Sequence, residues 1–346
     1  MESKSSAWRV TEADLKRNKE YDEYKKMNDE MLQRTDTDYA PWHIIEATDK
    51  EFATVKIYSA VIAAMEQKIQ EVKQEKEAKA KEDALKKQGV TEKAAEKSTG
   101  EDSVLRTSSL NSADLSLSYT KEEYKEKLEK LQNRIQELHG ELYQKRIPVI
   151  LGFEGWDAGG KGGAIKRLTE KMDPRGYQVN PTASPNDIER AHHYLWRFWN
   201  NVPKKGHIAI FDRTWYGRVM VERLEGFCSE NDWKRAYNEI NEFEKELSDW
   251  GAVIIKFWVH IDKGTQLARF TDRQNNPEKQ WKITDEDWRN REKWDAYETA
   301  VDEMLQKTST VYAPWHILES VDKKYARIKA LRIVIEEIEK TLDRVK

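Results

Sequence analysis

The stretch that decides the fold is Phe153-Glu154-Gly155-Trp156-Asp157-Ala158-Gly159-Gly160-Lys161-Gly162-Gly163. It follows the apolar run 147–153 and precedes the helix-forming run 164–168, which is the order strand, glycine-rich turn, helix. Glycines let the main chain turn its N–H groups inward, the helix start adds positive potential, and Lys161 adds a point charge. The pattern predicts a phosphate-binding loop, with Gly155, Gly159, Gly160, Gly162 and Gly163 as its phosphate-binding glycines. The alternative is a strand-to-helix turn without a ligand.

One position departs from the usual phosphate-binding loop, because Gly162 follows Lys161 where a serine or threonine hydroxyl commonly binds Mg²⁺. Asp157 lies inside the loop, and hard cations prefer carboxylate oxygens. We therefore expect Asp157 to be a catalytic, metal-binding residue. The alternative is that Asp157 caps the following helix.

A second signal is the run Ile208-Ala-Ile-Phe-Asp212-Arg213-Thr-Trp-Tyr-Gly-Arg218, in which an apolar strand delivers an acid and two arginines. The carboxyl end of such a strand faces the phosphate loop across the sheet, so Asp212 is a second candidate metal ligand. Arg213 is a candidate catalytic residue, and Arg218 a candidate phosphate-binding residue. The alternative is a buried Asp–Arg pair that fixes the loop.

A third signal is the basic and aromatic segment 268–282, which a proline interrupts. Such a segment is typical of a lid that closes over a phosphoryl-transfer site, with Arg273 as catalytic candidate and Lys279 and Lys282 as phosphate-binding candidates. Lys166 and Arg167 are further candidates for a cationic track. The alternative is a solvated basic helix followed by a surface turn.

Four apolar runs predict strands, at 147–153, 207–211, 252–260 and 315–318. Runs of helical character separate them, for example 188–200 and 233–250, and a capping-box pattern predicts a helix that begins at Thr120. Alternation of strands and helices favours an α/β fold with a mostly parallel sheet covered on both faces.

The chain contains an internal repeat, since residues 11–56 match residues 284–329 at a constant offset, with 22 identities in 46 positions. We therefore expect residues 1–75 to be a remnant of the C-terminal part of a duplicated first domain. Residues 76–118 are charged and Ser-rich, which predicts a helix and linker, and residues 119–346 are expected to form the phosphotransferase domain.

The 346 residues carry a net charge of −3, so general attraction to nucleic acid is not expected. Cys228 is the single cysteine, which excludes an internal disulfide and fits a reducing compartment. The N-terminus lacks an apolar signal core, and no apolar run approaches a membrane span. We expect a cytoplasmic protein without membrane or nucleic-acid partners.

The runs FEGWDAGGKGGAIKRL, YLWRFW, IFDRTWYGRVMVERLEGF and APWHILESVDKKYARIKALR resemble the family 2 polyphosphate kinases over residues 115–342. The offset repeat is similar to the tandem form of that family, which acts on AMP. The resemblance implies a P-loop kinase fold of the thymidylate-kinase type, with a five-stranded parallel sheet and a helical lid. It assigns Asp157, Lys161, Asp212, Arg213 and Arg273 to catalytic and phosphate-binding positions.

The same resemblance implies Mg²⁺ as cofactor, with Mn²⁺ as a substitute, and transfer of the terminal phosphoryl of inorganic polyphosphate to a nucleoside mono- or diphosphate. It also implies a homo-oligomer, for which the apolar positions of 57–72 offer a helix face. ADP or GDP as acceptor, ATP as the donor of a small-molecule kinase, and a non-catalytic polyphosphate-binding module are the alternatives.

Overall fold

The structure is a computed structural model and describes residues 12–87 and 110–344. The chain divides between Glu101 and Asp102 into an N-terminal unit and an α/β unit. Part of the predicted linker, residues 88–109, lies outside the described residues. Of the part that is described, Leu110 is buried in the core of the α/β unit.

The α/β unit is built on a five-stranded sheet in the order β2-β3-β1-β4-β5, in which every pair of neighbours is parallel. The strands are β1 (Val149–Gly155), β2 (Tyr177–Pro181), β3 (Ile208–Asp212), β4 (Val253–His260) and β5 (Trp315–Glu319). The predicted five-stranded parallel sheet is confirmed. Because parallel strands end at one edge, the loops after β1 and β3 meet there.

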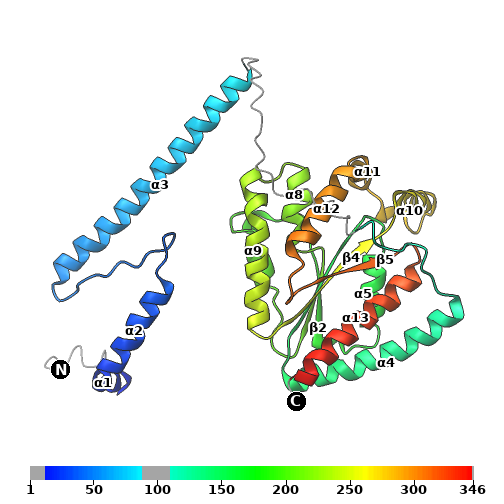
Figure 1. Ribbon diagram of the computed structural model, residues 1–346, viewed down its shortest axis with the longest axis horizontal. Helices are drawn as coiled ribbons and strands as arrows, with labels where there is room; N and C mark the ends of the chain where they lie inside the picture. Colours follow the sequence, from blue (N-terminus) through cyan, green and yellow to red (C-terminus); the bar gives the residue numbers. More distant parts are fainter. Residues whose placement is uncertain (1–11, 88–109, 345–346) are drawn as a thin grey trace. The chain divides into compact units, whose positions relative to one another are not determined.

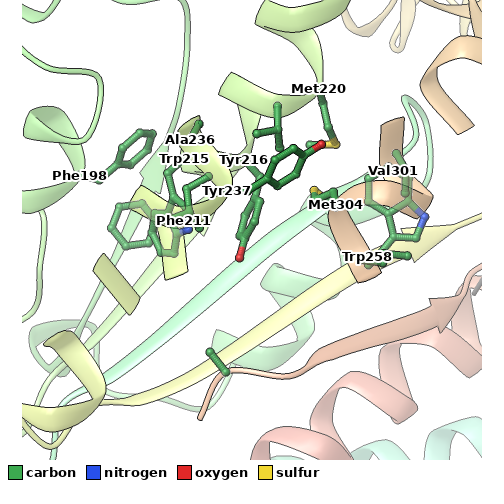
Figure 2. Packing of buried hydrophobic residues seen from close by; sticks show 14 of the residues in the cluster. Phe198, Phe211, Trp215, Tyr216, Met220, Ala236, Tyr237, Trp258, Val301 and Met304 are labelled. Atoms are coloured by element: carbon green, nitrogen blue, oxygen red, sulfur yellow. The ribbon is translucent and has the colours of Figure 1, made fainter. Parts of the chain in front are cut away.

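Helices cover both faces of this sheet (Figure 1). One face packs against α4 (Lys121–Lys145), α5 (Lys161–Thr169) and α13 (Lys323–Arg344), and the other against α9 (Glu230–Asp249) and α12 (Trp294–Thr308). The strands alternate between the two cores, as a pleated sheet requires: Ile254 and Trp258 belong to the α9 side, Ile255 and Phe257 to the α13 side. Figure 2 shows the aromatic core on the α9 side.

The remaining elements are short and lie in the connections. They are η2 (Pro174–Gly176), α6 (Asp187–Arg190), α7 (Trp196–Trp199), η3 (Trp215–Val219), α8 (Val221–Leu224), α10 (Lys263–Asn275), η4 (Gln280–Lys282) and α11 (Asp285–Glu292). The segment predicted as a helical lid, residues 268–282, comprises the end of α10 and η4. The helix α4 begins at the predicted capping box, in which the Thr120 hydroxyl accepts from the Glu123 N–H and the Glu123 carboxylate accepts from the Thr120 N–H.

Two secondary-structure predictions were wrong. The strand β2 was missed because it is a sheet-edge strand of mostly polar residues. The helix predicted over 188–200 is instead the two short helices α6 and α7. A straight helix would place Ile188 and Leu195 on one face, but Ile188 is exposed and Leu195 is buried, so the chain turns between them.

The N-terminal unit consists of α1 (Glu12–Lys19), α2 (Tyr21–Thr35) and α3 (Lys50–Lys87). These three helices fall at the repeat positions of α11, α12 and α13, whereas residues 42–46, which match β5, form no strand. The indole N–H of Trp42 donates to Thr35 Oγ1 at 2.7 Å, and that of Trp315 donates to Thr308 Oγ1 at 2.9 Å. The matching sequences therefore make the same turn twice.

The two copies differ in what covers their apolar side chains. Met304 is fully buried, whereas its counterpart Met31 is 43% exposed. Among the side chains that the structure describes in the N-terminal unit, Ala53 is the one buried hydrophobic, and α3 exposes Ile57, Val61 and Met65. The N-terminal unit has the local fold of the repeat without its hydrophobic core. In residues 12–87 and 110–344, no helix is long and apolar enough to cross a membrane.

Candidate active site

The phosphate loop runs from the end of β1 to the start of α5, as the glycine pattern predicts. Gly155 has φ +150°, and a Cβ there would lie 2.5 Å from the carbonyl oxygen of Val259, so no other residue fits. Lys161 is the first residue of α5, and its Nζ donates to the Gly155 carbonyl oxygen at 2.7 Å. The lysine thus lies over its own loop, where an anion bound by the loop would meet its charge.

Asp157 lies inside the loop and has two partners from distant segments. Its Oδ1 lies 3.6 Å from a guanidinium nitrogen of Arg213, and its Oδ2 accepts a hydrogen bond from Asn290 Nδ2 at 3.1 Å. The structure therefore brings Asp157 and Arg213 together, as the sequence predicted. Asn290 of α11 was not predicted, because an isolated asparagine carries no distinctive sequence signal.

Arg213 has a left-handed main chain, with φ +68°. Such a conformation costs a non-glycine residue about 1–2 kcal/mol, so the surroundings must hold it. Its N–H donates to the Phe153 carbonyl oxygen at 3.0 Å, and its own carbonyl oxygen accepts from Thr182 Oγ1 at 2.8 Å. The preceding residue, Asp212, is in register with Phe153. These contacts place Asp212 and Arg213 at the carboxyl edge beside the phosphate loop.

Glu154, at the end of β1, is hydrogen-bonded to the loop that follows β3, and the sequence analysis did not predict it. It is buried at the end of β1, and its Oε1 accepts from the Thr214 N–H at 2.6 Å and the Thr214 hydroxyl at 2.8 Å. Burial raises the pKa of Glu154, while the charge of Lys161 and the bonds from Thr214 oppose that rise. An acid that ends a strand directly before the loop is the signal that could have found it.

Four predicted residues are engaged away from the loop. Arg218 pairs with Glu222 at 2.9 Å, and Arg273 donates to the Lys282 carbonyl oxygen at 2.9 Å. Lys279 pairs with Asp272 at 2.9 Å, and the Lys282 ammonium lies over the Trp281 ring. None of these contacts reaches the phosphate loop.

A cationic cluster that the sequence did not reveal lies beside the loop. A Cβ built on Gly163 would lie 3.1 Å from Arg327 Nη2, and one on Gly160 would lie 3.9 Å from Lys323 Cγ. Burial lowers the pKa of Lys323, and so do the charges of Arg269, Arg327 and Arg273. Lys323 and Arg327 come from α13, for which the sequence analysis named no site residue.

An aromatic stack connects the loop to α12. The rings of Trp156 and Trp294 lie 3.7 Å apart at an interplanar angle of 9°, and the indole N–H of Trp156 donates to His260 Nδ1 at 3.1 Å. The ring of the residue before Asp157 is therefore held on one face by Trp294 and at its indole N–H by His260.

The residues present fit a magnesium ion that is shared with substrate. Within residues 12–87 and 110–344, no group of three His, Cys, Asp or Glu side chains is arranged to hold a metal. Mg²⁺ is usually bound by one or two carboxylates, several waters and the phosphates of the substrate. Asp157 and Asp212 at one sheet edge would supply the carboxylates that such a site requires.

The sequence model of a family described as polyphosphate kinase 2 matches residues 2–74 and 118–346. A polyphosphate:AMP phosphotransferase of Pseudomonas syringae pv. tomato is 43% identical over 343 residues, which cover 98% of this chain. An NDP-polyphosphate phosphotransferase 3 of Ruegeria pomeroyi is 38% identical, over 64% of this chain and 73% of its own length. A crystal structure of a polyphosphate kinase 2 from Pseudomonas aeruginosa superposes with a TM-score of 0.79 at 40% identity, covering 97% of this chain and 67% of that one.

The match to the Pseudomonas syringae relative covers 65% of that relative's length. A second polyphosphate:AMP phosphotransferase, from Pseudomonas aeruginosa, is matched over 64% of its length.

Proposed function

Because this chain belongs to the polyphosphate kinase 2 family, we propose that it transfers the terminal phosphoryl group of inorganic polyphosphate to AMP, giving ADP. The observation that carries the proposal is the edge at which Asp157 and Arg213 meet beside a glycine-rich loop and a cluster of cations. Such an edge suits two polyanions that must be brought end to end.

In the proposed reaction, a phosphate oxygen of AMP attacks the terminal phosphorus of the donor. The bond from that phosphorus to its bridging oxygen breaks, and the bridging oxygen leaves with the electron pair on the shortened polyphosphate. Positioning and charge stabilisation supply most of the catalysis in such a transfer. Lys161 and the loop N–H groups bind one phosphate group, while Arg213 neutralises charge on the phosphoryl group in flight.

Mg²⁺ bound by Asp157 and Asp212 would supply charge neutralisation at the phosphate oxygens. The hydrogen bond from Asn290 orients the Asp157 carboxylate. Arg273 stands one helical turn beyond Arg269 on α10, and we propose that it reaches the donor when the lid segment closes.

We further propose that the cationic cluster beside the loop binds the polyphosphate donor. We expect Lys323→Ser to raise the KM for long-chain polyphosphate about tenfold and to leave the KM for AMP within about twofold, because the cluster neutralises the many charges of the longer anion. Added KCl should likewise weaken donor binding more than AMP binding.

Steady-state kinetics over a range of KCl concentrations measure both effects. Lys234→Ser on α9 is the matched control, since its ammonium pairs with Glu230 on the surface. If KCl raises the two KM values equally, the cationic cluster of Lys323 and Arg327 does not bind the polyphosphate donor.

Product analysis tests the function itself. The full chain is incubated with Mg²⁺ and polyphosphate plus AMP, ADP or GDP, without ATP, and the nucleotides are separated. We expect ADP from AMP. Products from ADP or GDP but not from AMP would show that the acceptor is a nucleoside diphosphate, as in the name of the Ruegeria pomeroyi relative. Polyphosphate binding without turnover of any nucleotide would favour a non-catalytic binding module.

The wider organisation is also proposed. The repeated Trp–Thr hydrogen bond supports the proposal that residues 1–75 are a remnant of the C-terminal part of a duplicated first domain. The exposed apolar stripe of α3 offers a surface for self-association, which stays a prediction. The single cysteine supports a cytoplasmic location.

A further inference from the structure

Two side chains of α10 bind three consecutive carbonyl groups of the phosphate loop. Gln266 Nε2 donates to the Asp157 carbonyl oxygen at 3.2 Å. Arg269 Nη1 donates to the carbonyl oxygens of Ala158 at 2.9 Å and Gly159 at 2.8 Å. Gln266 and Arg269 are three positions apart, so they lie on the same face of the helix.

These contacts determine which way the loop's N–H groups point. In a trans peptide unit the N–H is directed opposite to the C=O. Carbonyl groups turned toward α10 therefore direct the N–H groups of Ala158 and Gly160 away from it, while the Gly159 N–H closes the turn onto the Trp156 carbonyl oxygen at 2.9 Å. A glycine-rich loop binds phosphate through main-chain N–H groups turned in this way.

The loop needs such support because its main chain is strained. Ala158 has φ +58°, a left-handed conformation in a residue with a Cβ, and Gly160 has φ +120°. A loop left to itself would relax from the Ala158 conformation. The hydrogen bonds to the carbonyl oxygens hold it there before any ligand binds.

Arg269 also ties the loop to a third segment. Its Nη2 donates to the carbonyl oxygens of Ser320 at 2.5 Å and Val321 at 3.1 Å, in the turn between β5 and α13. Ser320 Oγ in turn donates to the Gly159 carbonyl oxygen at 2.6 Å. One planar guanidinium thus bridges four main-chain oxygens, a geometry that a lysine ammonium with the same charge does not reproduce.

We propose that Arg269, assisted by Gln266, is a positioning residue that holds the phosphate loop in its anion-binding conformation without touching the substrate. The inference rests on the proposed function for its effect on turnover. Its effect on phosphate affinity is independent of the acceptor and of catalysis.

The test uses the full-length chain and inorganic tripolyphosphate as probe. We expect Arg269→Lys to weaken tripolyphosphate binding in calorimetry about tenfold and to speed hydrogen exchange at residues 158–163 about tenfold, with exchange in β1, β4 and α13 unchanged. Arg289→Lys on α11, an exposed position, makes the same chemical change and should leave both readouts at wild-type values. Wild-type affinity and loop exchange in Arg269→Lys would overturn the proposal.

Chemical rescue separates a positioning role from a general loss of stability. Guanidinium ion should restore most of the tripolyphosphate affinity of Arg269→Ala, and ammonium ion at the same concentration should not, because only the planar ion fits the carbonyl oxygens. Absence of guanidinium rescue would overturn the proposal.

If the Arg269 variants do not fold, the variant Gln266→Met tests the positioning role instead. It removes the bond to the Asp157 carbonyl oxygen, and the one that Gln266 Oε1 accepts from Arg291 outside the loop, while every contact of Arg269 stays. Loop exchange should rise about threefold, and unchanged exchange overturns the inference. A wild-type chain that turns over no nucleotide yet binds tripolyphosphate would refute the proposed function and leave this test in force.

Discussion

Replacement of Lys161 by alanine is expected to lower kcat/KM for transfer from polyphosphate to AMP at least a hundredfold. The ammonium lies over the phosphate loop, where its Nζ now donates to the Gly155 carbonyl oxygen. Removing one preorganised charge from a phosphoryl-transfer site costs about 3 kcal/mol of transition-state stabilisation. Steady-state kinetics with separated nucleotide products provide the measurement.

Lys161→Arg is the informative companion variant. It keeps the positive charge but replaces a compact ammonium by a planar fork, so its activity should fall between wild type and Lys161→Ala. Lys234→Ala on α9, whose ammonium pairs with Glu230 on the surface, serves as control for a change in lysine number. If Lys161→Ala keeps kcat/KM within about fivefold of wild type, the assignment of Lys161 is wrong.

Replacement of Lys256 by methionine should lower the free energy of unfolding by about 3–5 kcal/mol. Lys256 lies buried in β4, and its Nζ donates to Glu244 Oε2 at 2.8 Å, Tyr216 Oη at 2.7 Å and the Thr308 carbonyl oxygen at 2.7 Å. Without the ammonium, the fully buried Glu244 keeps a charge that no cation balances. Urea denaturation followed by circular dichroism measures the change.

The double variant Lys256→Met/Glu244→Leu shows whether the unpaired charge is the cause. Since both charges are removed, most of the lost stability should return, as a double-mutant cycle would report. Lys245→Met on the same helix as Glu244 is the matched control, because its pair with Asp249 is exposed. A double variant as unstable as Lys256→Met would contradict this explanation.

The sequence predicted the parts of the site that local patterns encode. The glycine and lysine spacing of the loop from Gly155 to Lys161 is typical of phosphate-binding loops. Asp212 and Arg213 stand at the end of an apolar run, which is typical of a buried strand. Parallel strands bring such ends to one edge, so the convergence of Asp157 and Arg213 followed from the topology.

The parts that escaped prediction depend on long-range packing. Arg269 and Arg273 stand on one basic helix, and nothing in their spacing says which guanidinium faces the loop. Lys323 and Arg327 start a helix whose apolar residues fill the core, so their cationic side toward Gly160 and Gly163 appears only when α13 packs beside α5. Composition alone does not distinguish these residues from solvated charges.

The stacked rings of Trp156 and Trp294 provide an intrinsic spectroscopic signal. Two indoles in van der Waals contact couple their electronic transitions, so the near-ultraviolet circular dichroism of the pair depends on their separation and tilt. Because one ring belongs to the residue preceding Asp157 and the other begins α12, a ligand that shifts the loop relative to that helix alters the signal without any added dye. Near-ultraviolet circular dichroism should therefore report the binding of phosphate compounds when they are titrated into the protein.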